Sequence, residues 1–188
     1  MMNPLLSPAP GFDQPLQLLS ACHGRMIGMT DMLAKLPQYI AQHGVNDDVA
    51  LAATRVLKYF DTAGQQHHED EEQDVFPLLR AAAAAQGNLE IPALLDELLA
   101  QHVGMNAAWQ TLRPHLCLLA EKQSVPESAY PAMQAFIDAY LRHIPLEEEK
   151  LLPYAATVLD AAQLATIGRA MAARRDLQGF QDGTIQVV

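Results

Sequence analysis

Histidine and glutamate recur in this chain at a spacing that suits metal binding. The segment HHEDEEQDVFP, which begins at His67, returns in altered form as HIPLEEEKLLP, which begins at His143. Aligned without a gap, the two segments also pair Glu71 with Glu147. A histidine and a carboxylate four residues apart lie on the same side of an α-helix, about 5.4 Å apart along its axis. Each pair can therefore bind one ion.

A single histidine precedes each of these pairs. LSACHGRM contains His23 and LLAQHVGM contains His102, so the order of a lone histidine followed by HxxxE occurs twice. This repetition indicates a duplicated metal-binding unit. The separation between the lone histidine and the pair, 44 positions in the first half and 41 in the second, is about two helix lengths. It suits antiparallel helices that face one another across a bundle core.

The six repeated side chains provide the donor atoms of an open site for two ions. Each lies on the apolar stripe of its predicted helix, where an uncompensated carboxylate would cost several kcal/mol to bury. Imidazole and carboxylate together suit iron, manganese or zinc. Four nitrogens and four oxygens fill about eight of the twelve positions of two six-coordinate ions, which leaves about four for solvent and an outside ligand. The predicted ligands are His23, His67, Glu71, His102, His143 and Glu147.

A second HxxxE pair lies one residue further along the first repeat. His68 and Glu72 have the same spacing in a shifted register. The gapless alignment also pairs Pro77 with Pro153, which supports the first register. We therefore predict that His67 and Glu71 are the ligands, and not His68 and Glu72.

The composition predicts helices to carry these residues. Half of the residues are apolar, only 6% are aromatic, and no segment has a clear strand pattern. We expect an all-α fold, an up-down-up-down four-helix bundle with a short additional C-terminal helix. Asp13 and Asp160 are the expected N-caps of the first and last helices. The four bundle helices are expected at about residues 15–40, from Asn46 or Asp47 to 85, 92–122, and from Pro126 or Pro131 to 152.

One domain accounts for the whole length of 188 residues. The bundle is expected to cover about residues 13–155 and the extra helix about 160–175, with a tail at 176–188. The net charge of −10 and the pI near 5.0 argue against nucleic acid or an anionic membrane surface as a partner. Without a long apolar run or a signal peptide, we expect a soluble, cytoplasmic protein. Two cysteines are too few for a cysteine-held iron–sulfur cluster.

The complete pattern resembles a known family. H, HHxxEExxxFP, H and HxxxE occur in this order over about residues 15–155, as in the hemerythrin-like HHE cation-binding domains. The resemblance implies a non-haem di-iron centre with two iron ions and an oxo or hydroxo bridge. It also implies that the four histidines are ligands and that Glu71 and Glu147 bridge the ions. Family roles include oxygen binding, oxygen or iron sensing, and the response to nitric oxide and oxidative damage.

One position departs from the oxygen-carrying members of that family. They have a second histidine one turn after the third-helix histidine, where this chain has Asn106. The set of four histidines and two glutamates looks more like the iron–sulfur repair proteins of the same superfamily. We therefore expect the diferrous protein to oxidise rapidly in air instead of carrying oxygen reversibly. The chain contains neither the Glu-x-x-His pairs of ferritin-like bundles nor the HExxH of zinc proteases.

Three classes of function agree with these observations. The first is a di-iron protein that binds a diatomic ligand or peroxide as a carrier, store or sensor. The second is an enzyme that reduces oxygen, nitric oxide or peroxide, or an iron donor for cluster repair. The third is an interaction module that the metal merely stabilises. The open coordination positions favour the first two classes, and the sequence assigns no catalytic residue and no protein partner or homodimer.

Overall fold

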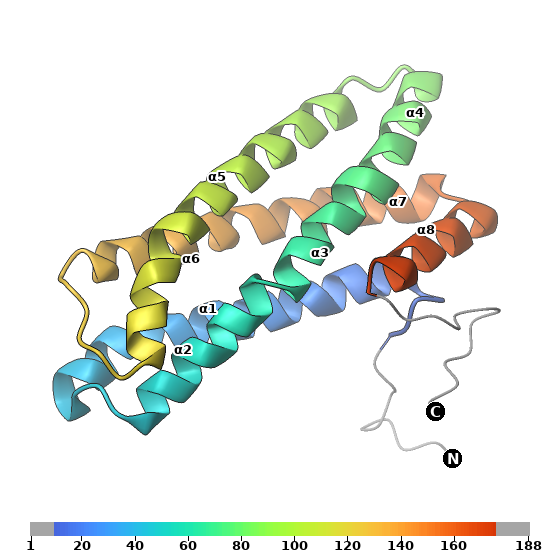
Figure 1. Cartoon of the computed structure of the whole chain (residues 1–188). Helices are drawn as coiled ribbons and strands as arrows, with labels where there is room; N and C mark the ends of the chain where they lie inside the picture. Colours follow the sequence, from blue (N-terminus) through green and yellow to red (C-terminus); the bar gives the residue numbers. More distant parts are fainter. Residues whose placement is uncertain (1–9, 176–188) are drawn as a thin grey trace, which may run out of the picture.

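The computed structural model describes residues 10–175, so the predicted tail at 176–188 lies outside the described residues. Within this range the structure is helical and contains no strand (Figure 1). The elements are α1 (Pro15–His43), α2 (Asp47–Phe60), α3 (Ala63–Asp70), η1 (Glu71–Val75), α4 (Phe76–Gln86), α5 (Glu90–Ala120), α6 (Ala129–Leu146), η2 (Glu147–Leu151), α7 (Leu152–Val158) and α8 (Ala161–Arg174).

Four long rods form an antiparallel bundle. The first is α1, the second runs from α2 through α4, the third is α5, and the fourth runs from α6 through α7 (Figure 1). Helix α1 contacts α2 and α6, and α5 contacts the same two helices from the opposite side. Each rod therefore packs against its neighbours in the chain, which confirms the predicted up-down-up-down bundle. The additional C-terminal helix is α8, which contacts α1, α3 and η1.

The second rod is broken, although a continuous helix was predicted there. Helix α2 ends at Phe60, and a turn at Asp61 and Thr62 precedes α3. Asp61 is held at this turn by α5, because the Arg113 guanidinium binds both of its oxygens at 2.9–3.0 Å. The Trp109 indole N–H donates to the same carboxylate at 3.0 Å. Contacts from another rod thus stabilise a break that local sequence does not reveal.

A single π-helical turn follows each HxxxE pair. In η1 the Phe76 N–H donates to the Glu71 carbonyl, and in η2 the Leu152 N–H donates to the Glu147 carbonyl. These are i→i+5 bonds, which are uncommon and often occur at functional sites. The proline of each repeat comes directly afterwards, in the first turn of α4 or α7, where its missing N–H is tolerated. The two repeats therefore share a backbone conformation as well as a sequence pattern.

Side-chain caps support two of the helix starts. The Asn46 side chain accepts from the N–H groups of Asp48 and Val49, as expected for the N-cap of α2. Asp160 forms a capping box with Gln163 at the start of α8. The prediction that Asp13 caps the first helix is wrong. Gln14 occupies that position and makes no side-chain cap, so α1 starts with Pro15 in its first turn.

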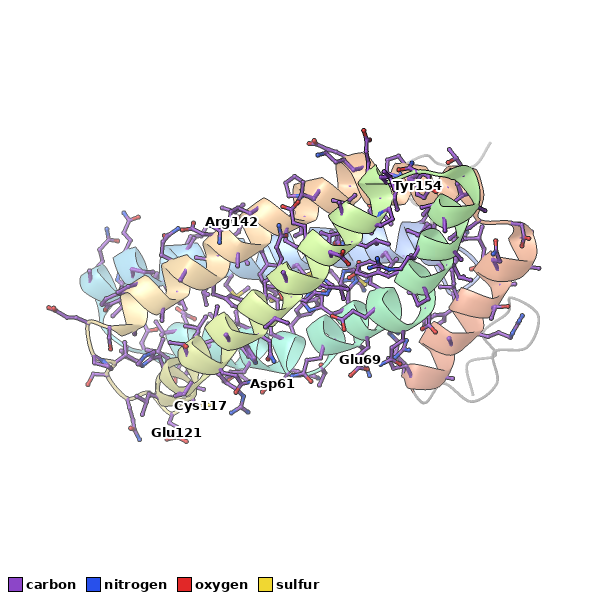
Figure 2. The ribbon with its side chains drawn as sticks, turned by 90° about the horizontal axis from the view of Figure 1, so that it is seen from above. Asp61, Glu69, Cys117, Glu121, Arg142 and Tyr154 are labelled. Carbon is purple, nitrogen blue, oxygen red and sulfur yellow. The ribbon has the colours of Figure 1, made fainter. Side chains whose placement is uncertain are left out.

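The apolar core is divided into two clusters by the proposed ligands. In α1, Leu19 belongs to one cluster and Met26 to the other, with His23 between them. In α5, Leu98 and Met105 flank His102 in the same way. A polar layer therefore crosses the bundle between two apolar clusters. Figure 2 shows the side chains that fill the space between the rods, with Asp61 and Glu69 along one edge of the molecule and Arg142 along the opposite edge.

Helix α8 is attached to the bundle near this polar layer. Asp70, the fully buried residue before Glu71, forms ion pairs with Arg174 and with Arg175, the latter at 2.7 Å. A second contact lies at Gly168, where a Cβ atom would be 1.9 Å from the Phe12 carbonyl oxygen. Among the described residues, none of the helices has the length and apolar character that a membrane span requires.

Candidate metal centre

The six predicted ligands meet in the polar layer. Each is at most 4% exposed, and they come from α1, α3, η1, α5, α6 and η2. Their donor atoms form two groups in which every atom lies within 4.8 Å of the others. The two groups share the carboxylates of Glu71 and Glu147. The layer thus has the composition and spacing of a site for two neighbouring ions.

The imidazoles of each half point toward the same place. His23 Nε2 lies 3.0 Å from His67 Nε2, and His102 Nε2 lies 3.1 Å from His143 Nε2. The rings of each pair are steeply inclined, at 79° and 61°. The two Nε2 atoms of each half thus converge on one place, where both could bind the same ion.

The two carboxylates reach both halves. Glu147 Oε2 lies 3.0 Å from His23 Nε2 and 3.2 Å from His143 Nε2. Glu71 Oε1 lies 3.1 Å from His67 Nε2, and its Oε2 lies 3.7 Å from His102 Nε2. Each carboxylate therefore lies between the histidine pairs, which is the position of a ligand shared by two ions.

The burial of the carboxylate oxygens and their lack of regular hydrogen bonds favour a cation between them. All four oxygens of Glu71 and Glu147 are buried, and none accepts a hydrogen bond of regular geometry, although histidine Nε2 atoms lie 3.0–3.2 Å from two of them. Burial alone would raise the pKa of Glu71, but the imidazoles of His67, His23 and His102 hold it well below its usual value. Ionised buried carboxylates without regular hydrogen bonds are costly unless positive charge compensates them. The residues present therefore fit a bound metal.

Protons compensate this charge when no metal is bound. Burial lowers the pKa of His23, but Glu147 and Glu71 outweigh that effect and raise it to about 11. Burial also opposes protonation of His67, whose pKa is raised to about 9, mainly by Glu71. Imidazolium then offsets carboxylate charge at neutral pH. Metal binding must displace these protons, so the affinity for metal increases with pH.

A second pair of carboxylates orients the lone histidines. His23 Nδ1 donates to Glu148 Oε1 at 2.6 Å, and His102 Nδ1 donates to Glu72 Oε1 at 2.7 Å. Ser20 also donates to Glu148, at 3.1 Å. Each of these glutamates belongs to the opposite half of the chain from the histidine that it holds. The sequence analysis missed this role, although the doublet Glu-Glu in both repeats was its signal.

The other two histidines differ in their outer partners. His143 Nδ1 donates to Gln101 Oε1 at 3.0 Å, whereas His67 Nδ1 is buried without a hydrogen-bond partner. A histidine that donates through Nδ1 keeps the lone pair of Nε2 for a metal. The structure thus prepares three of the four imidazoles for coordination through Nε2.

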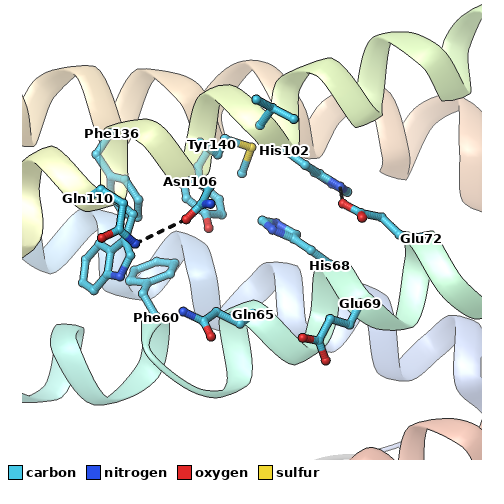
Figure 3. A pocket seen from close by; sticks show the side chains of 14 residues that line it. Phe60, Gln65, His68, Glu69, Glu72, His102, Asn106, Gln110, Phe136 and Tyr140 are labelled. Carbon is cyan, nitrogen blue, oxygen red and sulfur yellow. Dashed lines mark hydrogen bonds and ion pairs between the residues drawn. The ribbon is translucent and has the colours of Figure 1, made fainter.

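A pocket opens beside the centre on one side. It has a volume of about 520 Å³, and His68, His102 and Asn106 are among the residues that line it (Figure 3). Asn106 is exposed and accepts a hydrogen bond from Gln110 at 3.4 Å. His68 lies at the pocket, outside the six predicted ligands, with one ring nitrogen within 4.8 Å of nitrogens of His102 and His143. Burial, together with the neighbouring His102 and His67, lowers the pKa of His68 well below its usual value.

Comparison with known proteins agrees with this geometry. The model of the hemerythrin HHE cation binding domain matches residues 14–155, which include all six clustered side chains. The chain belongs to this family. A Haemophilus influenzae protein described as "Uncharacterized protein" is 33% identical over 168 residues, which are 89% of this chain and 93% of that protein. The fold, the cluster of histidine and glutamate side chains, and the family match all indicate a cation-binding domain.

The outer carboxylates of this hemerythrin domain should control the two ion positions separately. We expect Glu148→Ala to weaken the ion at His23 and His67, and Glu72→Ala to weaken the ion at His102. Each loss should be about 10–100-fold in affinity, because an outer partner fixes the orientation and basicity of a metal-bound imidazole. Titration of the metal-free protein with ferrous iron against a chelator measures both affinities.

Glu149→Ala is the matched control for this pair of variants. Glu149 is an exposed acid in the same acidic stretch, and its removal changes the net charge equally. If Glu149→Ala weakens iron binding as much as Glu148→Ala, the effect comes from general electrostatics and not from the hydrogen bond to His23.

Proposed function

We propose that this chain holds a non-haem di-iron centre that binds or reacts with oxygen, nitric oxide or peroxide. His23 and His67 would hold one ion, His102 and His143 the other, and Glu71 and Glu147 would bridge them. The observation that carries the proposal is the buried pair of carboxylates, without hydrogen bonds of regular geometry, between two convergent imidazole pairs. Nitrogen and oxygen donors in this ratio suit iron.

The pocket supports a reactive role over a purely structural one. It lets a small molecule approach the His102 side of the centre from solvent (Figure 3). Iron held there would supply a ferrous/ferric couple and open coordination positions for such a molecule. Polar side chains such as Gln65 and Asn106 line this pocket together with Trp109 and Phe136, so it suits a small polar ligand. Sensing of these small molecules, or a response to oxidative or nitrosative stress, is the role that this arrangement suits.

Asn106 supports reaction over reversible carriage. Its side chain is exposed and bonded to Gln110, and it is not part of the ligand cluster. One turn beyond His102, the chain therefore has no imidazole to occupy a further position on the adjoining ion. We expect the diferrous protein to oxidise in air to a stable diferric form.

Iron analysis combined with visible spectroscopy tests this function. The protein reconstituted with ferrous iron under anaerobic conditions should contain about two ions per chain, and His23→Ala or His143→Ala should lose iron. Exposure to air should produce ferric absorption bands that gas exchange does not reverse. A content near one ion per chain, or full iron retention in both variants, would contradict the proposed centre. Repeated oxygenation and deoxygenation without a reductant would contradict the expected oxidation in air. Unchanged spectra with oxygen, nitric oxide and peroxide would indicate a structural centre.

A further inference from the structure

His68 is a half-buried polar side chain that the centre described above does not use. It follows His67 on α3, and its Nε2 atom is buried without a hydrogen-bond partner. An unsatisfied buried nitrogen costs about 1–3 kcal/mol. Such an atom needs an explanation, and the described side chains supply no partner for it.

The position of His68 points to a metal-directed role. Its ring stacks on His102 with centroids 4.1 Å apart and lies edge-on to His143 at 5.9 Å. One nitrogen from each of these three residues lies within 4.8 Å of the other two. Figure 3 shows His68 beside His102 at the pocket. Three imidazoles thus gather around one ion position, on the side where solvent approaches.

The other ion position has no such neighbour. In the gapless alignment of the two repeats, His68 corresponds to Ile144, an apolar residue of the core cluster that contains Met26 and Met105. Within residues 10–175, the group that contains His23 and His67 is completed by the two shared glutamates alone. His68 therefore breaks the symmetry of the duplicated site in favour of the His102 side.

We propose that His68 supplies a third imidazole to the ion held by His102 and His143, and that it shares this position with small ligands that enter through the pocket. The inference rests on the proposed di-iron function. Parallel rings do not direct their nitrogens to one point, so the His68 ring has to tilt toward the ion. The adjoining pocket gives the ring room to tilt and to leave again.

This role has consequences that differ from those of a core residue. The two ions have unequal ligand sets, with three imidazoles on one and two on the other. An external ligand competes with His68 for its position, so removal of the imidazole favours that ligand. His68→Phe is the informative variant, because it keeps an aromatic ring in the same space but has no nitrogen.

Mössbauer spectroscopy and azide titration of the diferric protein test the proposal. Wild-type protein should show two distinct ferric doublets, and His68→Phe should bring their parameters together while both ions are retained. Azide should bind His68→Phe about tenfold more tightly, as expected from the loss of a competing ligand. Gln65→Ala is the matched control, because Gln65 lines the same pocket without a ring nitrogen, and it should leave both readouts unchanged.

Each contrary result has a separate meaning. Identical doublets and azide affinities in wild type and His68→Phe overturn the role of His68 and leave the di-iron function intact. Wild-type protein that does not hold two ions overturns the proposed function itself. If His68→Phe does not fold, His68→Ala serves instead, and added imidazole should restore its unequal doublets. Failure of imidazole to do so counts against the proposal.

Discussion

Replacement of Glu147 by glutamine is expected to lower the affinity for each ion of the proposed centre by more than about 100-fold, because even an outer partner is worth 10–100-fold and both ions would share this residue. Glu147 Oε2 lies within 3.2 Å of imidazoles from both halves of the chain. The glutamine side chain has the same shape, but it is neutral and replaces one oxygen by an NH₂ group. It therefore removes charge from both ion positions at once.

Thermal unfolding separates the loss of metal from a loss of fold. Iron should raise the melting temperature of wild type clearly and that of Glu147→Gln hardly at all, since binding to the native state alone stabilises it. With excess chelator the two proteins should unfold at more similar temperatures. Glu149→Gln, an exposed neighbour with the same chemical change, should behave as wild type. Retention of two ions by Glu147→Gln would show that this carboxylate does not bridge them.

Gly168→Val should produce a large loss of stability although it lies outside the centre. A Cβ atom at this position would lie 1.9 Å from the Phe12 carbonyl oxygen, which is main chain and cannot rotate away. Overpacking of this kind costs about 1–3 kcal/mol and sometimes more. Separation of α8 from α1 would also withdraw Arg174 and Arg175 from the buried Asp70.

Urea unfolding of the metal-free protein measures this effect. Gly104→Ala is the control, because Gly104 lies within α5 and a Cβ atom added there would meet nothing within 4 Å. That change should be neutral or stabilising by up to about 1 kcal/mol, as alanine favours helix over glycine. Equal stability of Gly168→Val and wild type would mean that α8 packs less tightly than the close approach to Phe12 indicates.

The cluster of proposed ligands was predictable because its histidine–glutamate pairs are only four residues apart in the sequence. His67 with Glu71 and His143 with Glu147 each lie on one helical turn, so periodicity alone brings each pair together. The duplicated order then placed His23 and His102 opposite them. Helix starts with strong side-chain caps, such as Asn46 and Asp160, were also predictable, since the cap acts within three residues.

Features that depend on contacts between distant residues were not predictable in the same way. The break at Asp61 is stabilised by Arg113, 52 positions away, and Asp70 is paired with Arg174, 104 positions away. The roles of Glu72 and Glu148 depend on how each helix is rotated about its own axis relative to its neighbours. Sequence periodicity does not give these rotations, because they are fixed only when the helices pack together.

The exchange of outer carboxylates between the halves limits when the protein can acquire its metal. Glu148 holds His23 although 125 positions separate them, and Glu147 is needed by both ion positions. A growing chain that has left the ribosome only as far as α5 has three of the four imidazoles but one of the two shared carboxylates. Iron that arrived then would be weakly held and exposed to oxidants. If the centre holds iron as proposed, secure loading therefore has to follow synthesis of the fourth rod, and the metal would enter an already folded bundle.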